Sequence, residues 1–275
     1  MKNEKNIAVL ITCHNRKYKT YKCLKNLLQA KTRGINIKIF LVDDGSSDGT
    51  SIFLKKKKIK NLTIVKGSGK LYWGGGTNLA WINSIKSKYK FDYFLWLNND
   101  TYLFKHALKN LIEAEKFLET DTFICVGTTI NNQKKRTYGG YKNLGSKFAK
   151  FKNTMIFPNQ TFQLIDRFNG NIVLISKKAH KKNGIIDKNL IHYFGDIDYG
   201  IKAFKKKIPV VLSPYNCGIC IKDNKNINFS DFFFGKKLIP NGYNFIKKNG
   251  GVFWLIHFAS FLITLLKERI GNKNF

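Results

Sequence analysis

Carboxylate side chains follow two apolar segments of this sequence and are the residues best suited to chemistry. Residues 37–42 run into Asp43 and Asp44, and residues 91–97 run into two asparagines and Asp100. Adjacent residues at a strand end point to opposite faces, so one carboxylate of the first pair can bind a ligand N–H while the other braces the turn. A glycine turn with a polar cap on the next helix explains the same pair, and both interpretations stay open.

Asp100 has the surroundings of a carboxylate that holds a divalent cation. It follows a predicted buried strand and is preceded by Asn98 and Asn99. Mg²⁺ keeps several waters and needs only one or two protein carboxylates beside the phosphates of a ligand, so one aspartate is enough. An Asx turn leading into the next helix explains the same residues with equal weight.

Glycines and a pair of aspartates mark the predicted starts of two helices. Residues 74–76 are three glycines before Thr77, the expected N-cap, and they let a ligand approach a helix N-terminus, which favours an anion. Asp196 and Asp198 lie at the start of a predicted helix over residues 196–206. One of them can serve as a general base while the other is structural, although acidic residues are common in first turns in any case.

Short strands alternating with helices must position these residues. The first half contains predicted strands at 7–12, 37–43, 62–65 and 91–97, and predicted helices at 18–30, 49–57 and 77–89. The second half contains predicted helices near 105–118, 176–182 and 196–206, strands near 123–129, 162–175 and 208–212, and a loop-rich stretch over 131–158. This alternation predicts a parallel sheet covered by helices, with ligands bound at the carboxyl ends of the strands.

Several segments, taken together and in order, resemble the family 2 glycosyltransferases, in particular rhamnosyltransferase-like members. They are Thr-Cys-His-Asn-Arg after the first strand, Val-Asp-Asp-Gly-Ser-x-Asp-Gly-Thr, Gly-Gly-x-Asn, Leu-Asn-Asn-Asp, Asn-Gly-x-x-x-Leu-Ile and Gly-Asp-Ile-Asp-Tyr-Gly. The resemblance covers about residues 6–212. It implies an α/β chain with the GT-A fold, a single Rossmann-like mixed sheet flanked by helices, and an inverting transfer from a nucleotide-activated sugar.

The resemblance also implies roles for single residues. Asp196 matches the aspartate that acts as catalytic base, and Asp100 is left as the carboxylate for Mg²⁺ or Mn²⁺. Gly195 stands where many relatives have a glutamate, so the sequence departs from the family at a position tied to acceptor contacts. The implied donor-binding residues are Thr12, Asp43, Asp44, Gly75, Gly76, Asn78, Asn98 and Asn99. The implied substrates are a UDP- or dTDP-sugar donor and a glycan or lipid-linked acceptor of cell-surface polysaccharide synthesis.

The composition excludes some classes of protein and leaves two alternative functions. The chain has 275 residues, 49 Lys and Arg against 17 Asp and Glu, and a formal net charge of +32. Its 23 Phe and 12 Tyr supply the burial that a disordered chain lacks. The charge suits phosphate backbones or anionic headgroups, but a solvated lysine-rich surface explains it better, and nucleic acid is not an expected partner. A nucleotidyltransferase on a similar sheet and a basic nucleic-acid-binding protein are the alternatives.

The end of the chain differs in composition from the rest. We expect residues 1–225 to form the catalytic domain and residues 226–275 a C-terminal helical extension. In the extension, residues 252–266 form an apolar run with basic flanks that is short of the roughly 20 residues of a bilayer span. An interfacial helix on an anionic membrane and a helix packed on the domain explain it equally well.

The N-terminal segment and the cysteine content both bear on the cellular location of the protein. The N-terminal segment lacks the apolar core of a signal peptide, and the 5 cysteines are an odd number without paired spacing. Both features predict reduced thiols and a cytoplasmic location, either free or peripheral on the inner face of the cell membrane.

Overall fold

The first half of the chain folds as the alternating strands and helices that its pattern predicts. The computed structural model describes residues 4–30, 32–143, 153–191, 194–221 and 238–249, with positions 255, 258, 259, 262 and 263. The strands are β1 (Lys5–Cys13), β2 (Ile35–Asp43), β3 (Leu62–Lys66) and β4 (Tyr93–Leu97), and the helices are α1 (Lys17–Gln29), α2 (Thr50–Lys56) and α3 (Tyr72–Lys86). The four strands run parallel in the order β3-β2-β1-β4.

The second half adds antiparallel strands to the same sheet. Its elements are β5 (Tyr102–Leu103), α4 (Ala107–Ile112), α5 (Ala114–Phe117), β6 (Ile124–Ile130), β7 (Arg136–Tyr138), β8 (Gly140–Asn143), β9 (Asn153–Met155), β10 (Gln163–Leu164), β11 (Arg167–Phe168), β12 (Ile172–Ser176), α6 (Lys177–Asn183), α7 (Gly195–Lys205), β13 (Val210–Ile219) and α9 (Leu238–Asn249). β12 lies antiparallel between β4 and β6, and β13 runs parallel to β6. The sheet is therefore mixed, as the family resemblance implies, and not wholly parallel, as the alternation alone predicts. A small second sheet has the order β11-β8-β9.

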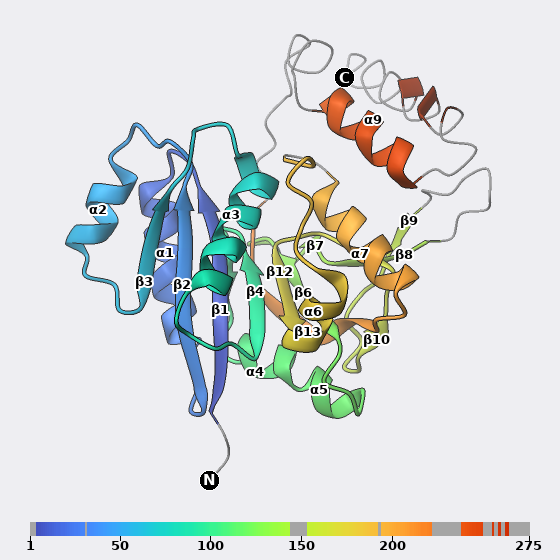
Figure 1. Ribbon diagram of the computed structural model, residues 1–275. Helices are drawn as coiled ribbons and strands as arrows, with labels where there is room; N and C mark the ends of the chain where they lie inside the picture. Colours follow the sequence, from blue (N-terminus) through green and yellow to red (C-terminus); the bar gives the residue numbers. More distant parts are fainter. Residues whose placement is uncertain are drawn as a thin grey trace.

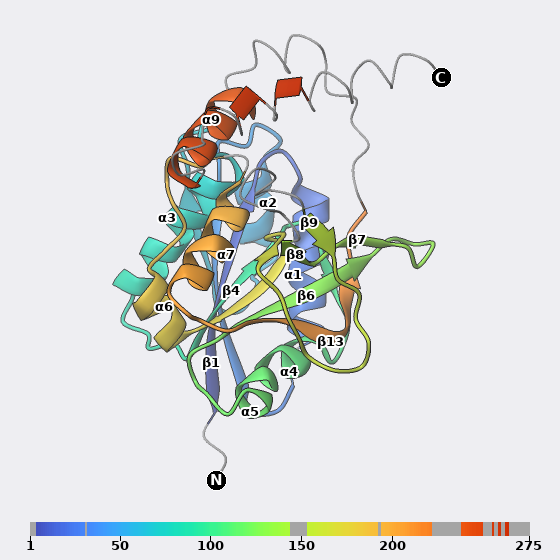
Figure 2. The ribbon, with the colours of Figure 1, turned by 90° about the vertical axis from the view of Figure 1, so that its right-hand side faces the viewer.

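Alternating side chains of β1 divide the core into two layers. Ile7, Val9 and Ile11 pack with residues of α1, α2 and α4, whereas Ala8 and Leu10 pack with residues of α3, α6 and α7. All five side chains are buried, since successive residues of a strand point to opposite faces and both faces are covered. Figure 2 shows α3, α6 and α7 together on one side of the sheet.

The helix α3 corrects one prediction. It begins at Tyr72, so the glycines at 74–76 lie in its first turns and Thr77 is a buried residue inside the helix instead of its N-cap. Glycine is a poor helix former, but a side chain does not fit here: a Cβ on Gly74 would lie 2.2 Å from the carbonyl oxygen of Leu190. Close packing therefore overrides the local preference.

Three other boundaries differ from the pattern. The helix predicted near 105–118 is broken into α4 and α5, and the stretch 131–158 contains β7, β8 and β9 instead of loop alone. β13 continues to Ile219 because its far end pairs with β5 and with the end of β6. These short strands depend on partners distant in the sequence, which local patterns do not reveal.

Helix α9 packs against the loop before α7, at the end of the molecule where Figure 1 places both. Phe245 and Ile246 of α9 are buried with Leu190, and the ring of Phe245 stacks on Phe194 at 4.9 Å between centroids. The apolar run 252–266 lies mostly outside the described residues. Among the residues that the structure describes, none of the helices is both long and apolar enough to cross a membrane.

The five cysteines form no disulfide bonds with one another in the structure. All five are free, and all five are buried.

Candidate active site

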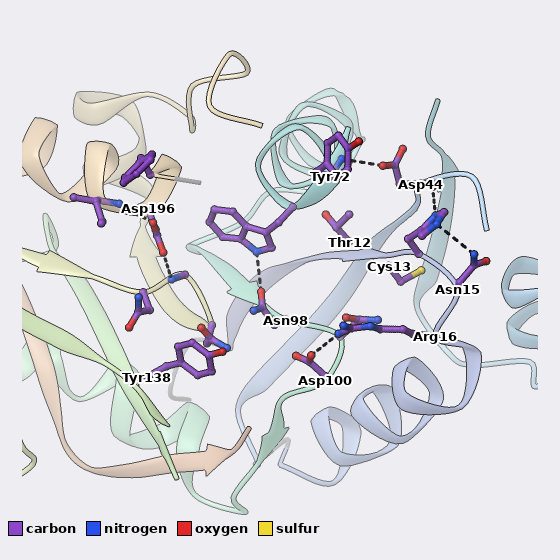
Figure 3. A pocket seen from close by; sticks show the side chains of 18 of the residues that line it. Thr12, Cys13, Asn15, Arg16, Asp44, Tyr72, Asn98, Asp100, Tyr138 and Asp196 are labelled. Atoms are coloured by element: carbon purple, nitrogen blue, oxygen red, sulfur yellow. Dashed lines mark hydrogen bonds and ion pairs between the residues drawn. The ribbon is translucent and has the colours of Figure 1, made fainter. Parts of the chain in front are cut away.

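A cavity of about 880 Å³ opens at the carboxyl ends of β1, β2 and β4, next to the start of α7. Loops that follow parallel strands gather at one edge of a sheet, which explains why segments far apart in the sequence meet here. The lining residues are Thr12, Cys13, His14, Asn15, Arg16, Asp44, Gly69, Tyr72, Trp73, Asn98, Asn99, Asp100, Tyr138, Asn169, Gly170, Asn171, Phe194, Asp196 and Ile197. Figure 3 shows Asp196 across the cavity from Asp44 and from the pair Arg16 and Asp100.

Asp43 and Asp44 have different surroundings, as expected for neighbours at a strand end. Asp44 lines the cavity, and its carboxylate accepts backbone N–H groups from Gly69 at 2.7 Å, Leu71 at 3.0 Å and Tyr72 at 2.9 Å. Asp43 is not a lining residue and accepts the N–H of Ser46 and the hydroxyl of Ser51. Asp43 therefore braces the turn, and Asp44 fixes the loop before α3 from the cavity side.

Thr12 is a cavity residue with a spare hydrogen-bonding group. Its Oγ1 atom is buried and finds no hydrogen-bond partner within the described part of the chain. A Cβ on Gly76 would lie 2.3 Å from Thr12 Cγ2 and 2.5 Å from Thr12 Oγ1, so α3 packs tightly against this side chain and its hydroxyl. A buried hydroxyl without a partner costs free energy, and a ligand that bonds it would recover that cost.

Besides Asp43, three of the predicted donor-binding residues do not line the cavity. Gly75, Gly76 and Asn78 belong to the buried part of α3, and the Asn78 amide donates to the carbonyl of Ile186 at 2.6 Å. They hold α3 against β1 and against the loop before α7. A direct contact between these residues and a donor stays a prediction.

Asn98, Asn99 and Asp100 all line the cavity, but each has its own partner. Asn98 Oδ1 accepts the indole N–H of Trp73 at 2.7 Å, and Asn99 is buried and donates to Thr20 Oγ1 at 2.9 Å. Asp100 Oδ2 is paired with Arg16 Nη1 at 2.5 Å. The two amides therefore shape the wall, and Asp100 carries the charge.

The residues around Asp100 fit a cation that is held mainly by its ligand. No group of three or more His, Cys, Asp or Glu side chains suited to a metal occurs among the described residues. Cys220 donates its thiol to Asp100 Oδ1 at 3.7 Å, and burial raises the pKa of this thiol to about 12, so it does not offer a thiolate. One carboxylate together with ligand phosphates matches the usual coordination of Mg²⁺. Such a cation would share Asp100 with Arg16 or displace the guanidinium.

Asp196 is a cavity carboxylate with a raised pKa. It lies in the first turn of α7, where its Oδ2 accepts the N–H of Gly170 at 2.8 Å and its Oδ1 accepts the N–H of Ile197 at 2.9 Å. Burial raises the pKa of Asp196 to about 6, against the lowering effect of those two N–H groups. A carboxylate with a pKa near the working pH is ionised but still basic enough to take a proton.

Asp198 does not line the cavity and instead binds helix α9. Its buried carboxylate accepts the Asn249 amide at 2.9 Å and the Lys248 ammonium at 2.9 Å, both from α9. Lys248 also contacts Asp187 at 2.8 Å, so α9 ties the start of α7 to the loop before it.

Several cavity residues were not predicted as site residues. Arg16 and His14 belong to the segment after β1, and the His14 ring contacts the carbonyl of Asp44 at 2.7 Å. Trp73 lies directly before the three glycines, and Gly170 lies in the Asn-Gly segment before β12. Both neighbouring motifs were visible in the sequence, but only folding shows that Trp73 and Gly170 face one cavity.

Comparison with known proteins gives two matches. The sequence profile of the family described as "Glycosyl transferase family 2" matches residues 8–183. A crystal structure of residues 1–349 of S. aureus TarS is similar, with a TM-score of 0.58 and 13% sequence identity over 89% of this chain and 65% of that chain. At this identity the likeness concerns the fold alone. A comparison with curated proteins finds no match.

Proposed function

Because the chain belongs to glycosyl transferase family 2, we propose that it transfers a sugar with inversion from a UDP- or dTDP-sugar to a glycan or lipid-linked acceptor. The mixed sheet with flanking helices is the GT-A fold that the sequence predicts, and the chain is a glycosyltransferase. The family match favours a glycosyltransferase over the two alternative functions, a nucleotidyltransferase and a nucleic-acid-binding protein.

The observation that carries the finer proposal is the position of Asp196 across one cavity from Asp44 and Asp100. Inversion requires the acceptor to attack the sugar from the face opposite the leaving diphosphate. A base on one side and a diphosphate site on the other meet that requirement. The half-buried Asp196, with a pKa raised to about 6, supports its assignment as the base.

The proposed reaction is a single displacement. The acceptor hydroxyl oxygen forms a bond to C1 of the sugar while the bond from C1 to the β-phosphate oxygen breaks. Asp196 takes the hydroxyl proton, and the nucleoside diphosphate leaves with the electron pair. Arg16, which lines the cavity beside Asp100, supplies a positive charge near the leaving group.

We assign the donor to the wall formed by Thr12, Asp44, Asn98 and Asn99, with Asp43 and the α3 glycines behind it. Thr12 lines this wall, and its Oγ1 has no hydrogen-bond partner among the described residues, which supports a contact with the nucleoside. Mg²⁺ or Mn²⁺, when bound through Asp100 and the donor phosphates, neutralises the charge of the leaving diphosphate as a Lewis acid.

The C-terminal segment supports the proposed class of acceptor and the proposed cellular location. We propose that residues 226–275 are a helical extension that brings the enzyme to anionic membranes, where lipid-linked or cell-surface glycans are made. The apolar run 252–266 between basic residues and the formal charge of +32 support this proposal.

A calorimetric panel tests the donor proposal directly. UDP-, dTDP-, GDP- and CMP-sugars are titrated into the protein with and without Mn²⁺ or Mg²⁺, and the released nucleotide is identified. We expect binding of a UDP- or dTDP-sugar that strengthens with the cation, and release of a nucleoside diphosphate on transfer. Release of pyrophosphate, or binding of none of these nucleotides, would contradict the proposal.

A further inference from the structure

Trp73 is a cavity residue that the proposed function leaves without a role. It is the second residue of α3 and is only partly buried, unlike Trp81 and Trp96, which are buried in the core. Its indole N–H donates to Asn98 Oδ1 at 2.7 Å, and its ring forms an edge-to-face pair with the Trp96 ring, with 5.7 Å between centroids and an interplanar angle of 83°. A side chain held by both a hydrogen bond and an aromatic contact has little freedom left to lose on binding.

The indole edge that carries the N–H group also lies against Gly170. A Cβ on Gly170 would lie 2.2 Å from Trp73 Cζ2 and 2.5 Å from Cη2, so only glycine fits beside this edge. The N–H of the same glycine donates to Asp196 Oδ2 at 2.8 Å. One edge of the indole, from Nε1 to Cη2, therefore meets both Asn98, two residues before Asp100, and Gly170, which donates to the proposed base.

This position is where a transferred sugar has to lie. In an inverting displacement, C1 of the sugar is located between the leaving diphosphate, assigned to Asp100, and the base, assigned to Asp196. Trp73 bridges those two residues through Asn98 and Gly170 and lines the cavity between them. The aromatic surface suits the C–H groups of a pyranose ring, because the negative face of the π system attracts weakly positive hydrogens.

We propose that Trp73 is the platform on which the donor sugar packs, with Asn98 and Gly170 fixing the ring in place. The proposal rests on the function proposed above and assigns the sugar subsite to a residue outside the nucleotide-binding wall. The platform selects donors whose sugar presents a C–H face to the indole, and it contributes nothing to the nucleoside diphosphate itself.

The test separates the sugar from the nucleotide. UDP and dTDP, and then UDP-glucose, UDP-N-acetylglucosamine, dTDP-glucose and dTDP-rhamnose, are titrated by calorimetry with Mn²⁺ into the native protein, Trp73→Phe and Trp73→Ala. Trp81→Phe is the matched control, since it makes the same change in the same helix at a ring that does not line the cavity. Circular dichroism establishes that each variant is folded.

We expect all four proteins to bind the diphosphates alike. The ratio of the sugar-nucleotide Kd to the diphosphate Kd should rise about two- to tenfold in Trp73→Phe, which loses the bond to Asn98, and further in Trp73→Ala. Trp81→Phe should keep the native ratio. A sugar nucleotide should also change the tryptophan fluorescence of the native protein more than its diphosphate does, and Trp73→Phe should abolish that difference.

Other outcomes would contradict either the role of Trp73 alone or the proposed function as well, and the two cases can be distinguished. An unchanged ratio in Trp73→Ala for every sugar nucleotide that binds would remove Trp73 from the sugar subsite and leave the proposed function standing. Binding of the diphosphates with no binding of any sugar nucleotide in the panel would do the same. Failure to bind any nucleotide would refute the proposed function and the platform together.

Discussion

Asp44 and Asp196 are both carboxylates that accept backbone N–H groups in one cavity, yet their surroundings prepare them for different tasks. Asp44 accepts three N–H groups from the loop before α3, so most of its hydrogen-bonding capacity is used within the protein. Asp196 accepts two, one of them from the next residue, and burial raises its pKa to about 6. Asp44 therefore braces the loop before α3, whereas Asp196 is the proposed base.

The supports of the two sides also differ in origin. The wall around Asp44 is built by turns that follow neighbouring parallel strands. The start of α7, which carries Asp196, is held by the loop before β12 and by α9. The donor side is therefore formed by the sheet itself, whereas the base side depends on separate segments packing together.

The largest effect is expected on the base side. Asp196→Asn should lower the transfer rate by roughly 10²–10⁴-fold, because an amide cannot take the acceptor proton. Donor affinity, measured by calorimetry, should stay near the native value since the shape is kept. A variant that transfers sugar at the native rate would show that Asp196 is not the base and would break the comparison.

Asp100→Ala should act on binding, in contrast to Asp196→Asn. Without this carboxylate, the cation and the diphosphate lose their anchor. The factor by which Mn²⁺ lowers the donor Kd should therefore be at least about tenfold smaller than in the native protein, which is roughly the contribution of one charge-assisted contact. The measurement is donor affinity with and without Mn²⁺. Unchanged stimulation by Mn²⁺ would remove Asp100 from the metal site.

The raised pKa of Asp196 predicts the acid limb of the pH profile. The carboxylate is the active form, so kcat/KM should fall as pH drops through about 6, close to tenfold per unit well below it. An ordinary aspartate would place this limb near pH 4. A profile that stays flat down to pH 4.5 would argue against Asp196 as the titrating group.

A smaller effect tests the support of the base side by α9. Asn249→Ala leaves the buried Asp198 with one hydrogen-bonding partner fewer, which should cost about 1–3 kcal/mol of unfolding free energy and lower kcat a few-fold. Lys205→Ala, at an exposed position of α7, is the control and should change stability by less than about 0.5 kcal/mol. Equal stability and rate in both variants would mean that α9 does not support α7.

The smallest effect on catalysis is expected from removing residues 250–275. This truncation keeps α9 and should leave donor hydrolysis unchanged while releasing the protein from anionic vesicles. Co-sedimentation with liposomes at low and high salt measures the difference between the two proteins. If the full chain stays in the supernatant at low salt, the anchor is refuted, and aggregation of the truncated protein would point to a segment that covers the domain's own core.

The sequence predicts the residues with strong local signals. β1, β2 and β4 were expected from short apolar runs, and Asp100 and Asp196 follow such runs or begin a helix in motifs that resemble the family. The placement of Asp44 against the cavity and Asp43 against the turn resolves an ambiguity that alternation alone leaves open. Local spacing determines on which face of a strand a side chain lies, but it does not determine which residues pack against that face.

Tertiary structure decided three features: the start of α3, the Arg16–Asp100 pair and the contact of Trp73 with Gly170. Three glycines signal a loop by propensity, yet they are helical because α3 packs against β1 and the loop before α7 with no room for side chains. Arg16 and Asp100 are 84 residues apart, so no local pattern pairs them. By itself the sequence determined the chemical groups and the strand ends that carry them, because these follow from hydrophobic period and residue type. Long-range packing decided which of these groups lie together. The free energy of a contact depends on both residues that form it, and these residues are distant in the sequence.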